Sequence, residues 1–169
     1  SFVVLDEAYG DYMPPAESAV RLIDKYDNLA VMRTFSKGMG AAGIRLGYLL
    51  ANPVVIGAAA KVNVPYSKNE IAGRIAEAII NCDWAGRCRE KVLIDKPRML
   101  ASLDKLKYSE TCNSVPITML YTDDESIDLC SLLEKVGIRA ITCDGYEGLG
   151  KNAVRLNIHK NIDRLIELL

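Results

Sequence analysis

Two short apolar runs joined by a glycine-rich loop constrain the fold of this 169-residue chain most. The runs, Leu29-Ala30-Val31-Met32 and Leu46-Gly47-Tyr48-Leu49-Leu50-Ala51, are each typical of a buried β-strand. The loop between them carries three glycines, a lysine at position 37 and, eight positions later, an arginine at position 45. Because α/β proteins place their chemistry where strands end, this loop is the first candidate for a functional site.

Lys37 is the candidate nucleophile of that loop. A lysine amine attacks only after it loses its proton, which partial burial and a neighbouring cation such as Arg45 both favour. Ser36 and Arg45 also offer a hydroxyl and a forked guanidinium, a pair suited to holding a phosphate. The loop alone does not show that Lys37 is a nucleophile, because a lysine beside glycines is more often a solvated turn residue.

A second stretch pairs a carboxylate with a phenol. Phe2-Val3-Val4-Leu5 reads as an apolar strand that runs into Asp6, and Tyr9 follows three residues later. The carboxylate can keep the ring nitrogen of a pyridine-type cofactor protonated, and the phenol can hydrogen-bond the ring oxygen. Alternatively, Asp6 begins a turn and Tyr9 packs at a sheet edge.

These stretches together carry a family resemblance. Val3-Val4-Leu5-Asp6-Glu7-Ala8-Tyr9, Thr34-Phe35-Ser36-Lys37 and Ala42-Gly43-Ile44-Arg45-Leu46-Gly47-Tyr48 resemble segments of the fold-type-I pyridoxal-phosphate enzymes, in the same order and at about the same spacing. The resemblance is to the class I and II aminotransferases, and within them to the histidinol-phosphate aminotransferase branch.

The resemblance implies a site built on pyridoxal 5'-phosphate. Lys37 would carry the Schiff base with the cofactor, Asp6 would face the pyridine nitrogen and Tyr9 would face the ring hydroxyl. Ser36 and Arg45 would bind the cofactor phosphate. The substrates implied are a small-molecule amino acid or amino-alcohol phosphate and a 2-oxo acid.

Arg155 is the candidate substrate-binding residue. It lies in Val154-Arg155-Leu156-Asn157-Ile158, an alternating strand pattern in which an arginine on the inward side would need an anionic partner. By alternation alone, Arg155 would face solvent. The segment resembles the small-domain strand of class I and II aminotransferases, which implies that Arg155 forks onto the substrate α-carboxylate.

The implied architecture is α/β. Residues 1–86 would be the C-terminal part of a pyridoxal-phosphate-binding large domain with a mainly parallel sheet and helices, and residues 87–169 would form a small α+β domain. The chain opens on a strand without an initiator methionine, so we expect it to be the C-terminal half of a longer enzyme with an incomplete site. The resemblance also implies a homodimer. The segment around Tyr66 resembles one that helps form the substrate pocket and dimer contact, and the equally weighted alternative is that Tyr66 is a packed loop aromatic.

The elements expected in detail are a surface helix over 17–25, small-residue and amphipathic helices over 54–60 and 70–82, and a long helix over 84–106 that Pro97 kinks or splits. Strands are expected over 117–121, 138–143 and 153–158. Ser126 should cap a helix to Lys135, and Asn161 should cap a last helix to Leu169.

Composition excludes some functions and leaves others open. With 21 basic and 22 acidic residues and a net charge of −1, no nucleic-acid or membrane surface is expected. No apolar run is long enough for a membrane span. Five cysteines without metal-ligand spacing favour reduced thiols in a cytoplasmic protein, and no metal site is expected.

Aminotransfer is the favoured function, and other readings remain open. A decarboxylase or lyase of the same fold would use the same cofactor, and a noncatalytic fold remnant would need none. A nucleotide-binding α/β domain is a further alternative, although no Gly-x-Gly-x-x-Gly or Walker pattern is present. Pro116-Ile117 and His159-Lys160-Asn161 depart from the branch's usual residues, which puts histidinol phosphate in question as the substrate.

Overall fold

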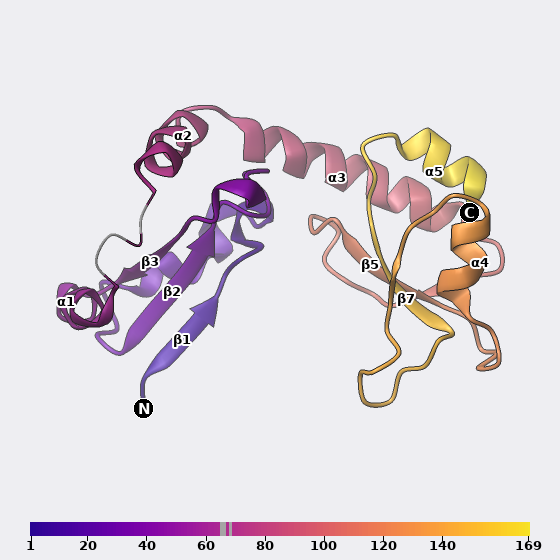
Figure 1. The fold of residues 1–169 in the computed structure, drawn as a ribbon, viewed down its shortest axis with the longest axis horizontal. Coiled ribbons are helices and arrows are strands. Elements are labelled where there is room, and N and C mark those ends of the chain that lie inside the picture. The colour runs from indigo at the N-terminus through magenta and orange to yellow at the C-terminus, as the bar shows by residue number, and fades with distance from the viewer. Residues whose placement is uncertain (65–66, 68) are drawn as a thin grey trace. The chain divides into compact units, whose positions relative to one another are not determined.

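The computed structural model describes residues 1–64, 67 and 69–169 (Figure 1). The chain divides into two compact units, Ser1–Arg89 and Glu90–Leu169, and the division falls inside helix α3, Trp84–Ala101. The assignment of residues 1–86 and 87–169 to a large and a small domain stays a prediction. Tyr66 lies outside the described residues. In the described part of the chain, the helices lack the length and apolar character needed to cross a membrane.

The first unit is built on a three-stranded sheet of order β1-β2-β3. Strands β1 (Val3–Asp6) and β2 (Leu29–Thr34) run parallel, with Asp6 beside Met32, and β3 (Gly47–Ala51) pairs antiparallel with β2. The parallel first pair and all three strands were predicted. Because β1 and β2 are parallel, their C-terminal ends meet at one edge of the sheet and bring Asp6 close to the loop that follows Thr34.

The helix predicted over 17–25 is wrong. The segment instead contains one short 3-10 turn, η3 (Ala19–Leu22), which follows two others, η1 (Gly10–Tyr12) and η2 (Pro15–Glu17). Ser18 has extended backbone angles and separates the last two turns. Its hydroxyl donates to Glu7 Oε2 at 2.8 Å, so a contact with the end of β1 replaces the helical hydrogen bonds.

A 3-10 turn lies between β2 and β3, and α-helices follow β3. A further 3-10 turn, η4, spans Ala42–Ile44, and α1 (Pro53–Val62) and α2 (Glu70–Ile80) begin at asparagine caps. The side chains of Asn52 and Asn69 each accept from the backbone N–H two residues on, at 2.9 Å. Pro97 lies inside α3 and does not split it, and the helix ends at Ala101, short of the predicted Leu106.

The second unit packs helices on an antiparallel sheet of order β4-β5-β7-β6. The strands are β4 (Lys107–Tyr108), β5 (Ile117–Tyr121), β6 (Ile141–Thr142) and β7 (Ala153–Asn157), and the helices are α4 (Leu129–Lys135) and α5 (Ile162–Leu168). Met99 of α3, Leu120 of β5 and Val154 of β7 are fully buried at its core. Leu129 and Leu133 of α4 and Ile162 and Leu165 of α5 join the same core.

Two local predictions for this unit are wrong. Ser126 does not cap α4: its hydroxyl donates to Asp124, and the carboxylate of Asp128 accepts from Ser131 N–H at the helix start. The strand expected over 138–143 shrinks to β6. Gly137, at φ 86°, ends α4, and Ile138 N–H donates back to Leu133, so the first residues of the expected strand form the helix C-cap. The cap predicted at Asn161 is confirmed.

Candidate functional site

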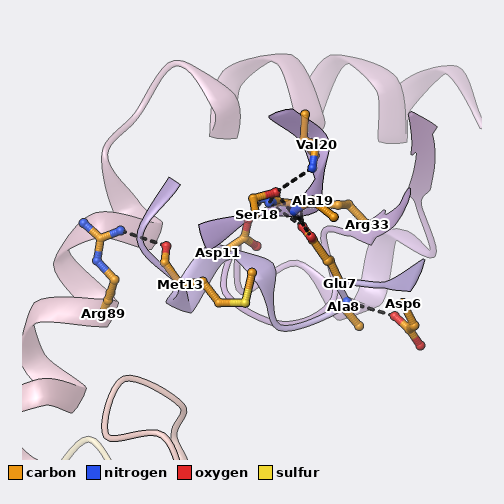
Figure 2. Close-up of polar contacts among 10 residues, drawn as sticks. All are labelled: Asp6, Glu7, Ala8, Asp11, Met13, Ser18, Ala19, Val20, Arg33 and Arg89. Carbon is orange, nitrogen blue, oxygen red and sulfur yellow. Dashed lines mark hydrogen bonds and ion pairs between the residues drawn. The ribbon is translucent and has the colours of Figure 1, made fainter. Parts of the chain in front are cut away.

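Asp6 and Tyr9 follow the end of β1, where the sequence placed them. The Asp6 carboxylate is exposed and accepts from Ala8 N–H at 2.9 Å, which closes a tight turn directly after the strand (Figure 2). Tyr9 follows Ala8 and lies at the start of η1. The alternative that Asp6 begins a turn is therefore confirmed, the cofactor role of Asp6 stays a prediction, and the turn leaves the carboxylate accessible to a ligand.

The Lys37 loop is folded back on itself at the end of β2. Ser36 N–H donates to Thr34 Oγ1 at 3.1 Å, Ala41 N–H donates to Phe35 O at 2.8 Å, and the Phe35 ring is buried. Lys37 is exposed, so the described residues do not provide the partial burial considered from the sequence. Its Nζ lies 5.5 Å from the centroid of the Tyr9 ring. The fold thus joins the two sequence stretches at one sheet edge.

Ser36 and Arg45 also come together. Arg45 Nη1 lies 3.5 Å from Ser36 Oγ, at the outer limit of a hydrogen bond, and donates to Ala42 O at 3.1 Å. Arg45 has left-handed backbone angles of φ 51° and ψ 47°, which are uncommon for a residue with a side chain. A half-buried serine hydroxyl beside an exposed guanidinium is a donor set that fits a phosphate.

Sequence reasoning missed a cluster of polar, mostly buried side chains next to this edge. Glu7 Oε2 accepts from Arg33 Nε at 3.0 Å and from Arg33 Nη2 at 2.7 Å, and Glu7 Oε1 accepts from Ala19 N–H at 2.7 Å (Figure 2). Arg33 Nη2 also donates to Ser18 Oγ, and Arg33 Nη1 lies 3.5 Å from Asp11 Oδ1. The sequence feature that could have indicated the cluster is Arg33, an arginine directly after the apolar run Leu29–Met32 and four residues before Lys37.

The pKa values of the two carboxyl groups of the cluster, Glu7 and Asp11, shift in opposite directions. Burial alone would raise the pKa of Glu7, but hydrogen bonds from Ala19, Ser18 and Arg33 outweigh it and lower the pKa below its usual value of 4.5. Burial raises the pKa of Asp11, and the charge of Arg33 offsets that rise only in part. Glu7 is therefore held as a carboxylate, while Asp11 is the weaker acid.

The pKa of Glu7 leads to a prediction about acid stability. A carboxyl group whose pKa is lowered by folding stabilises the fold above its unfolded pKa, and this contribution is lost as pH falls through the folded pKa. At pH 7 we expect Glu7→Gln to lower the unfolding free energy by about 1 to 3 kcal/mol. The difference from wild type should shrink below pH 4.5, the usual value. Urea denaturation at neutral and acidic pH measures this, and a constant difference would contradict it.

Arg155 belongs to the second unit and is described within that unit. It lies on β7 opposite Met119 of β5 and Ile141 of β6, and its side chain is exposed. Val154 and Leu156, its neighbours along β7, are buried against the core on the other face. The structure thus places Arg155 on the open face of this sheet, as strand alternation predicted, with its guanidinium accessible to an anion.

The comparison with protein families covers the whole chain. The model of the family described as aminotransferase class I and II matches residues 1–169. The chain belongs to the class I and II aminotransferases. Histidinol-phosphate aminotransferase of Chlorobaculum tepidum is 29% identical over all of this chain and 49% of its own length. Because the chain spans about half of this relative, the activity, substrates and partners of the whole protein are proposals.

Solved structures show the fold of this aminotransferase chain. It matches histidinol-phosphate aminotransferase from Clostridium acetobutylicum with a TM-score of 0.81 at 23% identity, over all of this chain and 53% of that one. It also matches L-threonine-O-3-phosphate decarboxylase from Porphyromonas gingivalis with a TM-score of 0.77 at 20% identity, over 98% of this chain and 52% of that one. The predicted fold class, part of a fold-type-I architecture, is confirmed.

Proposed function

We propose that this aminotransferase chain is part of a pyridoxal-phosphate enzyme that moves an amino group between an amino acid or amino-alcohol phosphate and a 2-oxo acid. One observation carries the proposal: the Lys37 amine beside the Tyr9 ring, on the loop that also brings Ser36 and Arg45 together. When bound, pyridoxal 5'-phosphate supplies an electron-withdrawing ring that stabilises negative charge on the substrate α-carbon.

The residues have separate roles in this proposal. Ser36 and Arg45 hold the phosphate, Asp6 keeps the pyridine nitrogen protonated, and Tyr9 donates to the ring oxygen. Lys37 would hold the cofactor through its Nζ and, when a substrate occupies the site, the free amine would move the proton at the substrate α-carbon.

Substrate recognition is proposed for the second unit. Arg155 offers its exposed guanidinium to the substrate α-carboxylate, since a planar fork matches a carboxylate in two hydrogen bonds. In the proposed reaction the 2-oxo acid carries such a carboxylate whichever amino donor is used, so Arg155 fits both an amino acid and an amino-alcohol phosphate as the donor. We also propose a homodimer in the cytoplasm.

Trapping the cofactor on its lysine tests the proposal. The whole gene product is incubated with pyridoxal 5'-phosphate and reduced with borohydride, and the modified lysine is located by peptide mass. Modification confined to Lys37 is the expected result. Modification at another lysine, or at none, would refute the proposed function.

A decarboxylase is the second candidate, because the Porphyromonas gingivalis decarboxylase shares this fold at a TM-score of 0.77. Both reactions use the same electron sink and differ in which bond at the α-carbon breaks. Loaded enzyme mixed with an amino acid and a 2-oxo acid distinguishes them. A new amino acid without carbon dioxide supports aminotransfer, and carbon dioxide release supports the decarboxylase.

A further inference from the structure

We propose that Glu7, Arg33 and Asp11 act as a positioning cluster that fixes the Lys37 amine relative to the Asp6 carboxylate. The inference rests on the proposed function and assigns a role in it to three residues that the proposed function leaves without one. All three lie in the first unit, and their side chains are 9%, 16% and 7% exposed.

The first half of the cluster holds the end of β1 to β2. Glu7 follows Asp6 directly, and its backbone N–H donates to Met32 O at 2.9 Å. Its carboxylate then takes two hydrogen bonds from Arg33, the next residue of β2. Residue 7 is thus joined to β2 through both its main chain and its side chain, which leaves Asp6 little freedom to move relative to that strand.

The second half reaches from Arg33 to the Lys37 loop. The guanidinium presents Nε and Nη2 to Glu7 and Nη1 to Asp11. Asp11 in turn lies directly against Gly38, where an added Cβ would stand 2.4 Å from Asp11 Cβ and 2.9 Å from Asp11 Oδ2. Gly38 is the neighbour of Lys37, so the side chain of Asp11 sets how closely the loop that carries Lys37 approaches the turn η1.

A guanidinium suits this place better than an ammonium. Its rigid fork can face two carboxylates in fixed directions, and Gly10 leaves room for it, since a Cβ there would lie 2.8 Å from Arg33 Cζ. Figure 2 shows the Asp6 carboxylate apart from this cluster, beside Ala8, while Glu7 points toward Ser18 and Arg33. The exposed carboxylate is therefore left for a ligand, and the buried one serves as an anchor.

The test compares variants of the whole gene product loaded with pyridoxal 5'-phosphate. Arg33→Lys keeps the charge and loses the fork, and Glu7→Gln and Asp11→Asn remove one charge each. Val31→Ala is the matched control, because Val31 is fully buried on the same strand and lies outside the cluster. The readouts are thermal stability, kcat and KM, and the midpoint pH at which visible absorption of the lysine-bound cofactor changes.

We expect the cluster variants to shift that midpoint by about half a pH unit or more. Their kcat should fall about tenfold, with KM changed by less than about twofold, because misplaced groups weaken the chemical step more than binding. Val31→Ala should lower stability and leave the midpoint in place.

Two negative results remain distinguishable. If wild type is labelled at Lys37 but the cluster variants move the midpoint no more than Val31→Ala at equal loss of stability, the positioning role is refuted and the proposed function stands. If wild type binds cofactor at no lysine, both fail. Should Glu7→Gln not fold, Asp11→Asn and Arg33→Lys decide the question.

Discussion

Replacing Lys37 with alanine is expected to lower kcat for aminotransfer by about a thousandfold or more. The amine is the group assigned both to hold the cofactor and to move the α-carbon proton, and loss of a residue with such a role removes most of the rate enhancement. Ser36, Arg45 and Asp6 remain in the variant, so binding of the cofactor should weaken less than the rate falls. Steady-state kinetics and borohydride labelling measure the two effects separately.

The chain offers a matched control for this variant. Lys25 Nζ lies 5.3 Å from the centroid of the Tyr26 ring, nearly the same contact that Lys37 makes with Tyr9. Lys25→Ala removes an exposed lysine and a lysine–tyrosine contact in the same unit, and it should retain the wild-type rate. Activity of Lys37→Ala within about tenfold of that control would contradict the assignment of Lys37.

The second large effect is expected for Lys96, a fully buried lysine on α3. Its ammonium group donates to Thr111 Oγ1 at 2.6 Å and to the backbone oxygens of Cys112, Val115 and Ile117 at 2.8 to 3.1 Å. Burial lowers the pKa of Lys96 from its usual value. The cation thus organises the chain that leads into β5 by gathering four oxygen acceptors around one charge.

Lys96→Met should therefore lower the unfolding free energy of this unit by about 2 to 4 kcal/mol. The apolar side chain fills the space but leaves several desolvated oxygens without their donor, and each such loss is costly. Lys107→Met is the control: it removes a lysine whose ion pair with Asp123 is exposed, and it should behave as an ordinary surface substitution. Chemical denaturation followed by far-UV circular dichroism compares the two, and equal losses would contradict the role given to Lys96.

Local sequence signals identified much of this fold because they depend on neighbouring residues. Apolar runs located β1, β2 and β3, and the cap at Asn161 follows from a side chain that bonds three residues ahead. The meeting of Lys37 and Tyr9 was also within reach, since two parallel strands must end at the same sheet edge.

Two of the misses share one cause, which is contact between residues distant in sequence. Ser18 leaves the expected helix because its hydroxyl donates a hydrogen bond to Glu7, 11 residues earlier. Arg33 directly follows the apolar run that predicted β2, and its partnership with Glu7 spans 26 positions. No periodicity or spacing encodes such a pairing, so the positioning cluster became visible only once the strands were placed side by side.

The edge strand β1 has a practical consequence for handling the polypeptide. In the described sheet it pairs on one side with β2, and Phe2, Val3, Val4 and Leu5 are 39 to 53% exposed. An open edge of β-branched and aromatic residues is a template for strand addition between molecules. Samples of these 169 residues alone should therefore self-associate through β1, and a lysine introduced at Val4 would improve solubility without altering a site residue.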